Sequence, residues 1–217
     1  MIRLEEISKR YPGGHEALTD VSLEINAGEM AYITGHSGAG KSTLLKLIAA
    51  IERPSTGALW FHEQNISRIQ RRSIPWLRRN FGLIFQDHKL LFDRNAIHNV
   101  LLPLEIAGFP RHDAFARARA ALDKVGLLSR ERAMPVTLSG GEQQLLCIAR
   151  AIATHPPLLL ADEPTGNLDS EATASIMRIF REFNRTGTTV IVSSHDPAAI
   201  LPGTGRVIQL DHGRVLP

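Results

Sequence analysis

Short apolar segments rich in β-branched residues or leucine recur along the chain, with helical patterns between them. The apolar segments are Met30 to Thr34, Leu158 to Ala161 and Thr188 to Ser193. Helical patterns over Lys41 to Ile51 and over Ser170 to Asn184 follow the first two segments. This alternation predicts an α/β fold with a parallel core sheet.

Two regions depart from that pattern. In the first thirty residues, apolar and polar positions alternate on either side of the turn Pro12 to Gly14, which predicts an N-terminal antiparallel β region. From about residue 88 to 154 helical patterns replace strands, and Ala114 to Val125 is one of them. We therefore expect a mainly helical insertion between strands of the core sheet.

The composition fits one domain. The chain has 217 residues, of which 43% are hydrophobic and 22% charged. We expect a single domain, with a core formed by residues 1–86 and 156–217 and a helical subdomain at 87–155. A net charge of +3 is too small to indicate a nucleic-acid partner, and the single Cys147 excludes an intrachain disulfide. The acidic start of the chain is unlike a secretory signal, and no apolar run approaches the length of a membrane span, so we expect a cytoplasmic location.

The segment Gly35 to Ser42 matches the phosphate-loop pattern G-x-x-x-x-G-K-[ST] between a predicted strand and a predicted helix. Glycines let the backbone turn so that its N–H groups face a polyphosphate. Lys41 would neutralise phosphate charge, and Ser42 would supply a hydroxyl to Mg²⁺. The alternative is a glycine-rich turn before an ordinary helix. The candidate nucleotide-binding residues here are Gly35, His36, Ser37, Gly38, Ala39, Gly40, Lys41, Ser42 and Thr43.

Two adjacent carboxylates, Asp162 and Glu163, follow the predicted strand Leu158 to Ala161. Parallel sheets bind ligands at the carboxyl ends of their strands, and neighbouring strand residues point to opposite sides. We therefore expect Asp162 to help hold Mg²⁺ and Glu163 to be the catalytic carboxylate that orients the attacking water. The alternative is a pair of acids in a surface loop.

The segment Leu138 to Gln144 reads Leu-Ser-Gly-Gly-Glu-Gln-Gln. Ser139 and Glu142 fit a capping box at the start of an amphipathic helix. Two glycines in the first turn of a helix cost stability unless the backbone must approach something closely. Because a helix N-terminus with free N–H groups binds anions, this segment is a second candidate phosphate site.

This segment resembles the signature of ATP-binding-cassette (ABC) ATPases, and the other elements of that family match in order across nearly the whole chain. The resemblance implies an ABC-type P-loop NTPase, a Mg²⁺-dependent ATPase. It implies that Tyr11 stacks on adenine, that Gln86 contacts Mg²⁺ and γ-phosphate, and that Asp169 and His195 are the D-loop aspartate and the switch histidine. It also implies a homodimer in which Ser139, Gly140 and Gly141 of one chain cover ATP held by the other.

Each of these assignments has a structural alternative. Tyr11 would be a packed turn aromatic, Gln86 a polar residue at a strand end, Asp169 the first acid of a helix, and His195 a loop histidine. The chain also departs from the family at three positions. Leu145 stands where Arg is usual, His36 where Pro is usual, and Ser194 where Thr is common.

Within the family, several segments resemble the members that act in cell division with an integral membrane partner. Those segments are Arg10 to Gly14, Ile74 to Arg79, Phe85 to His88, Leu90 to Leu91 and Asp93 to Arg94. The resemblance implies a peripheral protein at the cytoplasmic face of the inner (plasma) membrane, with the partner bound at about residues 87–110. The alternative is the ATPase subunit of a lipoprotein-release, macrolide-export or small-solute transporter.

Five arginines lie within the twelve residues 68–79. Three interpretations are open: a solvated surface, a contact with anionic lipid headgroups, or a nucleic-acid contact. We do not expect nucleic acid, because aromatic platforms for bases are missing there. The arginines are Arg68, Arg71, Arg72, Arg78 and Arg79.

Overall fold

The structure is a computed structural model that describes residues 1–166, 168–196, 200 and 203–216. Its first sheet is antiparallel, with the strand order β2-β1-β4-β5. Leu4 lies opposite Leu23 across the first hairpin, as the alternation of apolar residues predicts. The strands are β1 (Ile2–Arg10), β2 (Glu16–Ile25), β4 (Thr56–Phe61) and β5 (Gln64–Asn65).

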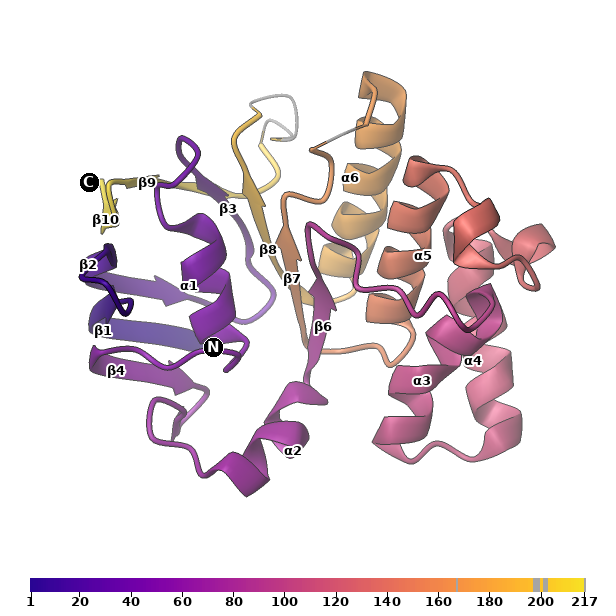
Figure 1. Cartoon of the computed structure of the whole chain (residues 1–217), viewed down its shortest axis with the longest axis horizontal. Helices are drawn as coiled ribbons and strands as arrows, with labels where there is room; N and C mark the ends of the chain where they lie inside the picture. The colour runs from indigo at the N-terminus through magenta and orange to yellow at the C-terminus, as the bar shows by residue number, and fades with distance from the viewer. Residues whose placement is uncertain (167, 197–199, 201–202, 217) are drawn as a thin grey trace.

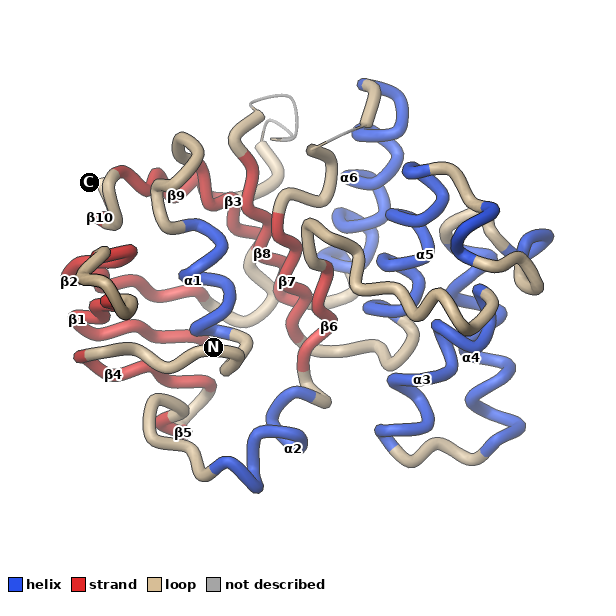
Figure 2. Tube along the Cα trace, viewed as in Figure 1, coloured by secondary structure: helices blue, strands red, loops and turns tan. Residues whose placement is uncertain are grey.

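The second sheet has the order β10-β9-β3-β8-β7-β6. All neighbours are parallel except β10, which pairs antiparallel with β9. Figure 2 shows this sheet in the middle of the molecule, between the antiparallel sheet and the helices. The predicted α/β fold with a parallel core sheet is confirmed. The strands are β3 (Met30–Thr34), β6 (Phe81–Ile84), β7 (Leu158–Asp162), β8 (Thr189–Ser194), β9 (Arg206–Asp211) and β10 (Arg214–Val215).

The core sheet is buried on both faces, and strand alternation divides its residues between two apolar clusters. Ala31 and Ile33 of β3 pack with the antiparallel sheet and α1 (Lys41–Ile48). Met30 and Tyr32 of the same strand pack on the other side, with the helical part of the chain. Burial on both faces explains why the core strands are almost continuously apolar.

Most helices lie on the face of the core sheet that points away from the antiparallel sheet, whereas α1 packs on the opposite face (Figure 1). The predicted helical insertion is confirmed, and its helices are α3 (Ala96–Ala107), α4 (Arg111–Lys124) and α5 (Gly140–Ile152). The remaining helices are α2 (Ile74–Arg78) and α6 (Ser170–Arg185). Short 3-10 turns lie at Arg71–Ser73, Leu128–Arg130 and Pro135–Thr137. Helix α1 ends at Ile48, three residues before the predicted end, and Ala50 takes a left-handed conformation with φ 51 just beyond it.

Two of the five arginines have structural partners. Arg78 donates to the carbonyls of Ala49 at 3.4 Å and Ala50 at 2.8 Å, and thereby satisfies backbone acceptors at the end of α1. The Arg79 guanidinium lies 3.9 Å from the ring centroid of the exposed Trp76. The exposed Trp76 lies within this arginine-rich segment, so the expectation that aromatic side chains are missing there is wrong.

Candidate functional site

The phosphate-loop segment connects β3 to α1, and its conformation requires glycine at two positions. Gly35 has φ 151, and a Cβ there would lie 2.1 Å from the Leu210 carbonyl oxygen. Gly40 is the left-handed N-cap of α1 with φ 106, and a Cβ there would lie 2.5 Å from the Ala17 oxygen. The loop is therefore pressed against β2 and β9, where any side chain at these two positions would clash.

Lys41 begins α1, and its ammonium group is held inside the loop. Its Nζ donates to the carbonyl oxygens of Gly35 at 2.8 Å and His36 at 3.1 Å. It also lies 3.3 Å from Glu163 Oε1, although its side chain is only 6% exposed. A nearly buried cation requires such compensation, so a phosphate in the loop would compete for the same charge.

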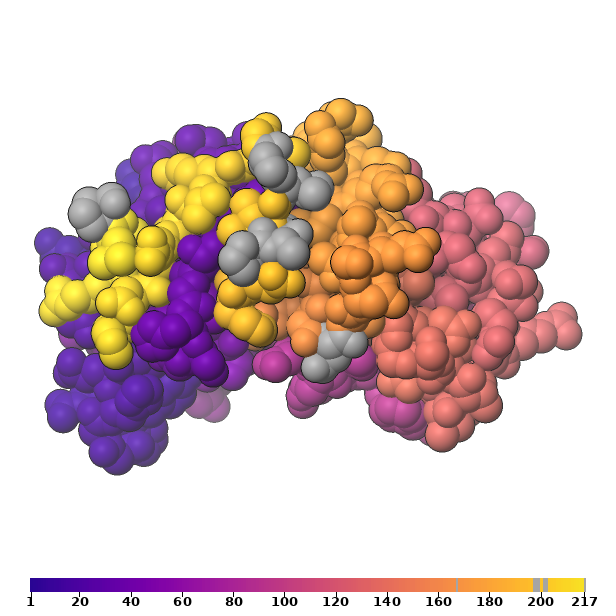
Figure 3. Space-filling view, turned by 90° about the horizontal axis from the view of Figure 1, so that it is seen from above, coloured from indigo at the N-terminus to yellow at the C-terminus, as the bar shows by residue number. Residues whose placement is uncertain are grey.

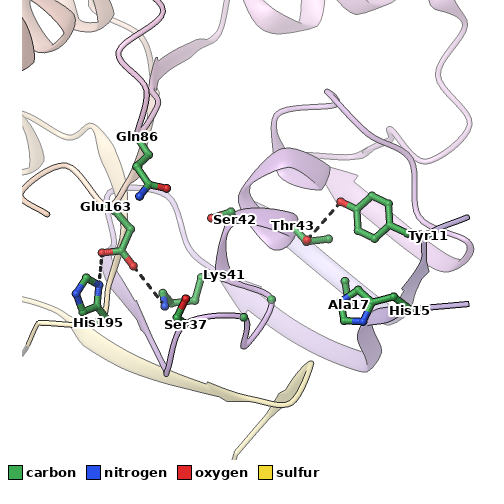
Figure 4. A pocket seen from close by; sticks show the side chains of 12 residues that line it. Tyr11, His15, Ala17, Ser37, Lys41, Ser42, Thr43, Gln86, Glu163 and His195 are labelled. Carbon is green, nitrogen blue, oxygen red and sulfur yellow. Dashed lines mark hydrogen bonds and ion pairs between the residues drawn. The ribbon is translucent and has the colours of Figure 1, made fainter. Parts of the chain in front are cut away.

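The two carboxylates face different partners, and Figure 4 shows those of Glu163. Asp162 ends β7, and its Oδ1 accepts from Ser42 Oγ at 3.0 Å. Glu163 Oε2 contacts His195 Nδ1 at 2.7 Å, and its Oε1 contacts Lys41. Glu163 lies beyond the strand with a left-handed φ of 49, so the divergence of the two side chains comes from the end of the strand as well as from its alternation.

A cavity of about 380 Å³ opens beside the loop and brings together much of the predicted site. Figure 4 shows residues that line the cavity, with Tyr11 on one side and Glu163 and His195 on the other. The lining residues are Tyr11, His15, Ala17, Ser37, Gly38, Gly40, Lys41, Ser42, Thr43, Gln86, Glu163 and His195. The predicted residues outside this lining are Gly35, His36, Ala39, Ser139, Gly140, Gly141, Asp162 and Asp169.

Tyr11 is fixed in the wall of this cavity by its hydroxyl. The hydroxyl donates to Glu52 Oε1 at 2.9 Å and lies 3.4 Å from Thr43 Oγ1. Burial is the main cause that raises the pKa of Tyr11 above its ordinary value. The ring is thus packed and also positioned at the cavity, so the two interpretations of Tyr11 are compatible.

The signature segment lies apart from the phosphate loop. Gly140 lines a smaller cavity of about 170 Å³, which shares Gln86, Glu163 and His195 with the first one. The expected capping box is present, because the Glu142 N–H donates to Ser139 Oγ at 3.2 Å and the Ser139 N–H to Glu142 Oε2 at 2.8 Å. The hydrogen bond from the Ser139 backbone is the main cause that lowers the pKa of Glu142.

The capping box does not explain the two glycines. A Cβ at Gly140 would have no neighbour within 4 Å, and one at Gly141 would lie 3.6 Å from Leu168 Cδ2, which is ordinary contact. Neither glycine has a left-handed φ. Within the described part of the chain, no contact therefore requires glycine at the start of α5.

Asp169 has the structural role that its alternative interpretation gives it. It is the N-cap of α6, and its Oδ1 accepts from the Ala172 N–H at 2.8 Å. An N-cap of this kind satisfies one of the free donors of the first turn.

The structure adds a residue that the sequence analysis missed. Ser193 is completely buried in β8, donates to Asp162 Oδ1 at 2.7 Å and accepts from the Glu163 N–H at 3.1 Å. It therefore orients the Asp162 carboxylate and anchors the backbone of Glu163. The only signal in the sequence is a polar residue at the end of an apolar strand.

A second missed residue, Arg150 of α5, holds the segment that follows Gln86. Its guanidinium donates to the carbonyl oxygens of Lys89 and His88, each at 2.6 Å. The buried Cys147, whose pKa burial raises to about 11, also donates to the His88 carbonyl oxygen at 2.7 Å.

Comparisons with known proteins show the family of the chain. The family described as ABC transporter matches residues 18–166. The cell division ATP-binding protein FtsE of Escherichia coli K12 is 53% identical over 99% of this chain and 97% of its own length. FtsE of Bacillus subtilis 168 is 39% identical over 100% of this chain and 95% of its own. The ATP-binding cassette MJ0796, solved as a dimer bound to ADP and Pi, is 34% identical with a TM-score of 0.93, covering 100% of this chain and 97% of that one.

The chain belongs to the ABC transporter family of ATP-binding proteins. Within that family, the predicted resemblance to the cell-division ATP-binding proteins named FtsE is confirmed over nearly the full length of the chain.

Replacing Ser193 tests its role in orienting the Asp162 carboxylate. Ser193→Ala removes a buried donor to Asp162, so we expect the free energy of unfolding to fall by about 1–3 kcal/mol. Ser194→Ala is the matched control, because its hydroxyl is also buried but bonds only to the backbone of Asp196 among the contacts described. Urea unfolding should show a lower free energy of unfolding for both variants. Only Ser193→Ala should also weaken nucleotide binding, and equal nucleotide affinities in the two variants would contradict the assigned role.

Proposed function

We propose that the chain binds and hydrolyses ATP with Mg²⁺ at a site completed by a second copy of the same chain. The observation that carries this proposal is the empty space around Gly140, where a side chain would meet nothing although glycine weakens a helix. An exposed helix start without side chains suits a phosphate brought by another subunit. The dimeric structures of the MJ0796 cassette support the same arrangement.

The oxygen ligands that Mg²⁺ needs are present beside the phosphate loop. Asp162 Oδ1 and Ser42 Oγ lie 3.0 Å apart, and Gln86 lines the same cavity as Ser42. Carboxylate, hydroxyl and amide oxygens fit this ion, which is commonly held by one or two protein groups together with substrate phosphates. When bound, Mg²⁺ would neutralise charge on the phosphate oxygens.

Residues of the chain itself bind the nucleotide and activate the attacking water. The loop N–H groups and Lys41 bind the phosphates, and Tyr11 presents its ring to the adenine. Glu163, oriented by His195, positions the attacking water and accepts its proton. Ser139, Gly140 and Gly141 of the second copy cover the γ-phosphate. Asp169 of that copy lies at the same interface between the two subunits. We also infer the division into a core of residues 1–86 and 156–217 and a helical subdomain at 87–155.

A groove of about 290 Å³ offers a place for a membrane partner. It lies where β6 meets α3 and α5, beside the segment that follows Gln86. Ile106 lines this groove and is 52% exposed. We propose that an FtsX-like integral membrane protein binds here, at the cytoplasmic face of the membrane, and that ATP-driven dimer closure signals through it in cell division and peptidoglycan remodelling. Among the described residues, no helix is both long and apolar enough to cross a membrane.

Glu163→Gln tests the hydrolytic role. The amide keeps the shape of the side chain but cannot accept a proton, so we expect ATP hydrolysis to fall at least tenfold, with general-base losses typically ~10²–10⁴. ATP binding should persist, and dimers should accumulate in size-exclusion chromatography with ATP. Glu182→Gln, at an exposed position on α6, is the control. Normal turnover in Glu163→Gln would remove Glu163 from the mechanism.

Gly140→Ala tests whether a second copy completes the site. Because the added methyl group meets nothing in the subunit, we expect the free energy of unfolding to stay unchanged or to rise by up to about 1 kcal/mol. ATP hydrolysis and ATP-dependent dimerisation should nevertheless fall, since the methyl group blocks close approach of a phosphate. Analytical ultracentrifugation and steady-state hydrolysis measure both. Full activity would argue against a shared site.

Ile106→Glu tests the groove. We expect loss of co-purification with the membrane partner from detergent extracts, because a charge cannot be buried against an apolar surface without a partner. ATP hydrolysis by the isolated chain should be unchanged. Val207→Glu is a matched control, since Val207 is 50% exposed and lies on β9, outside the groove. Equal capture of the partner by both variants would contradict the location.

A further inference from the structure

The phosphate loop is hydrogen-bonded to the β9–β10 hairpin through residues that do not line the nucleotide cavity. The Gly213 N–H donates to the Ala39 oxygen at 3.0 Å, and the Gly213 oxygen accepts from the Thr19 N–H at 2.8 Å. In the space-filling view from above, the yellow C-terminal residues lie against a violet segment of the early chain (Figure 3). These backbone contacts fix the positions of the side chains at this junction.

Three potential metal ligands meet there: His36 from the loop, and Asp211 and His212 from the hairpin. Asp211 Oδ1 lies 3.2 Å from His36 Nε2 and 3.9 Å from His212 Nε2. One ligand atom from each residue lies within 4.8 Å of the others. The ligands of a tetrahedral zinc ion with bonds near 2.0–2.2 Å are separated by about 3.3 Å. Small side-chain rotations would therefore bring all three atoms to one ion.

The hydrogen bonding of His36 supports a cation at this point. Its Nδ1 lies 2.7 Å from the Ser37 carbonyl oxygen, which only accepts, so Nδ1 carries a proton. In the neutral ring Nε2 then presents a lone pair to the Asp211 carboxylate. Two acceptors at this distance need a proton or a metal ion between them. A backbone carbonyl on the other ring nitrogen is also the usual support of a metal-bound histidine.

We propose that His36, Asp211 and His212 form a binding site for a divalent transition-metal ion of the zinc class. Two imidazole nitrogens and one carboxylate favour such an ion over Mg²⁺, which prefers oxygen. The side chains are 47%, 44% and 83% exposed, so water completes the coordination. His36 does not line the nucleotide cavity. Its carbonyl oxygen nevertheless accepts a hydrogen bond from Lys41 Nζ. The ion would therefore tie the phosphate loop to the hairpin without occupying the nucleotide site.

Competition between the untagged, nucleotide-free chain and a chromophoric chelator for Zn²⁺, in excess Mg²⁺, tests the proposal. We expect one Zn²⁺ per chain and at least tenfold weaker binding by His212→Asn. Asparagine suits this position because His212 has a left-handed φ of 43, which asparagine tolerates. His112→Asn is the matched control, since His112 pairs with the neighbouring Asp113 at 3.4 Å but belongs to no three-ligand group among the described residues.

Thermal unfolding gives an independent measurement. A ligand that binds the folded state raises the unfolding temperature, so Zn²⁺ should stabilise the wild-type chain and His112→Asn more than His212→Asn. Two results would overturn the proposal. One is the absence of 1:1 binding by the wild-type chain, which would leave a protonated histidine paired with Asp211. The other is unchanged affinity in His212→Asn, which would place the ion elsewhere.

Discussion

Four neighbouring parallel strands end at one edge of the core sheet, and the polar groups of the site follow those ends. The order β3-β8-β7-β6 places the phosphate loop, His195, the two carboxylates and Gln86 side by side. The strands are buried on both faces, so their register is fixed by the two apolar clusters. Packing in the two apolar clusters therefore determines which side chains meet at the nucleotide site.

The charged side chains at this edge of the sheet compensate one another. Lys41 is nearly buried between two carbonyls and Glu163, and Glu163 in turn contacts His195. A phosphate that takes over Lys41 would release one oxygen of Glu163 and leave the other against His195. In the proposed mechanism, the arrival of substrate thereby frees the carboxylate that must act as the base, because the same cation serves both anions in turn.

Much of this arrangement could be predicted from the sequence because it depends on local rules. The phosphate loop, the capping box of Ser139 and Glu142, and the acids after an apolar strand each follow from spacing within a few residues. The role of Ser193 could not, because it depends on β8 pairing between β3 and β7, which are distant in sequence. The contact of the β9–β10 hairpin with the loop is hidden for the same reason, since no local pattern joins residue 213 to residue 39.

In the proposed mechanism, the link from a membrane partner to the nucleotide site depends on one helix. Helix α5 carries the signature glycines at its start and Arg150 near its end. Arg150 holds the carbonyls of His88 and Lys89, both of which have left-handed φ values, just after Gln86. Because Arg150 and Lys89 also line the proposed groove, a partner seated there would act on a rigid helix rather than on an isolated loop. In the proposed mechanism, a displacement of that helix would move the signature glycines and the segment after Gln86 together, so partner binding would be coupled to closure of the shared site.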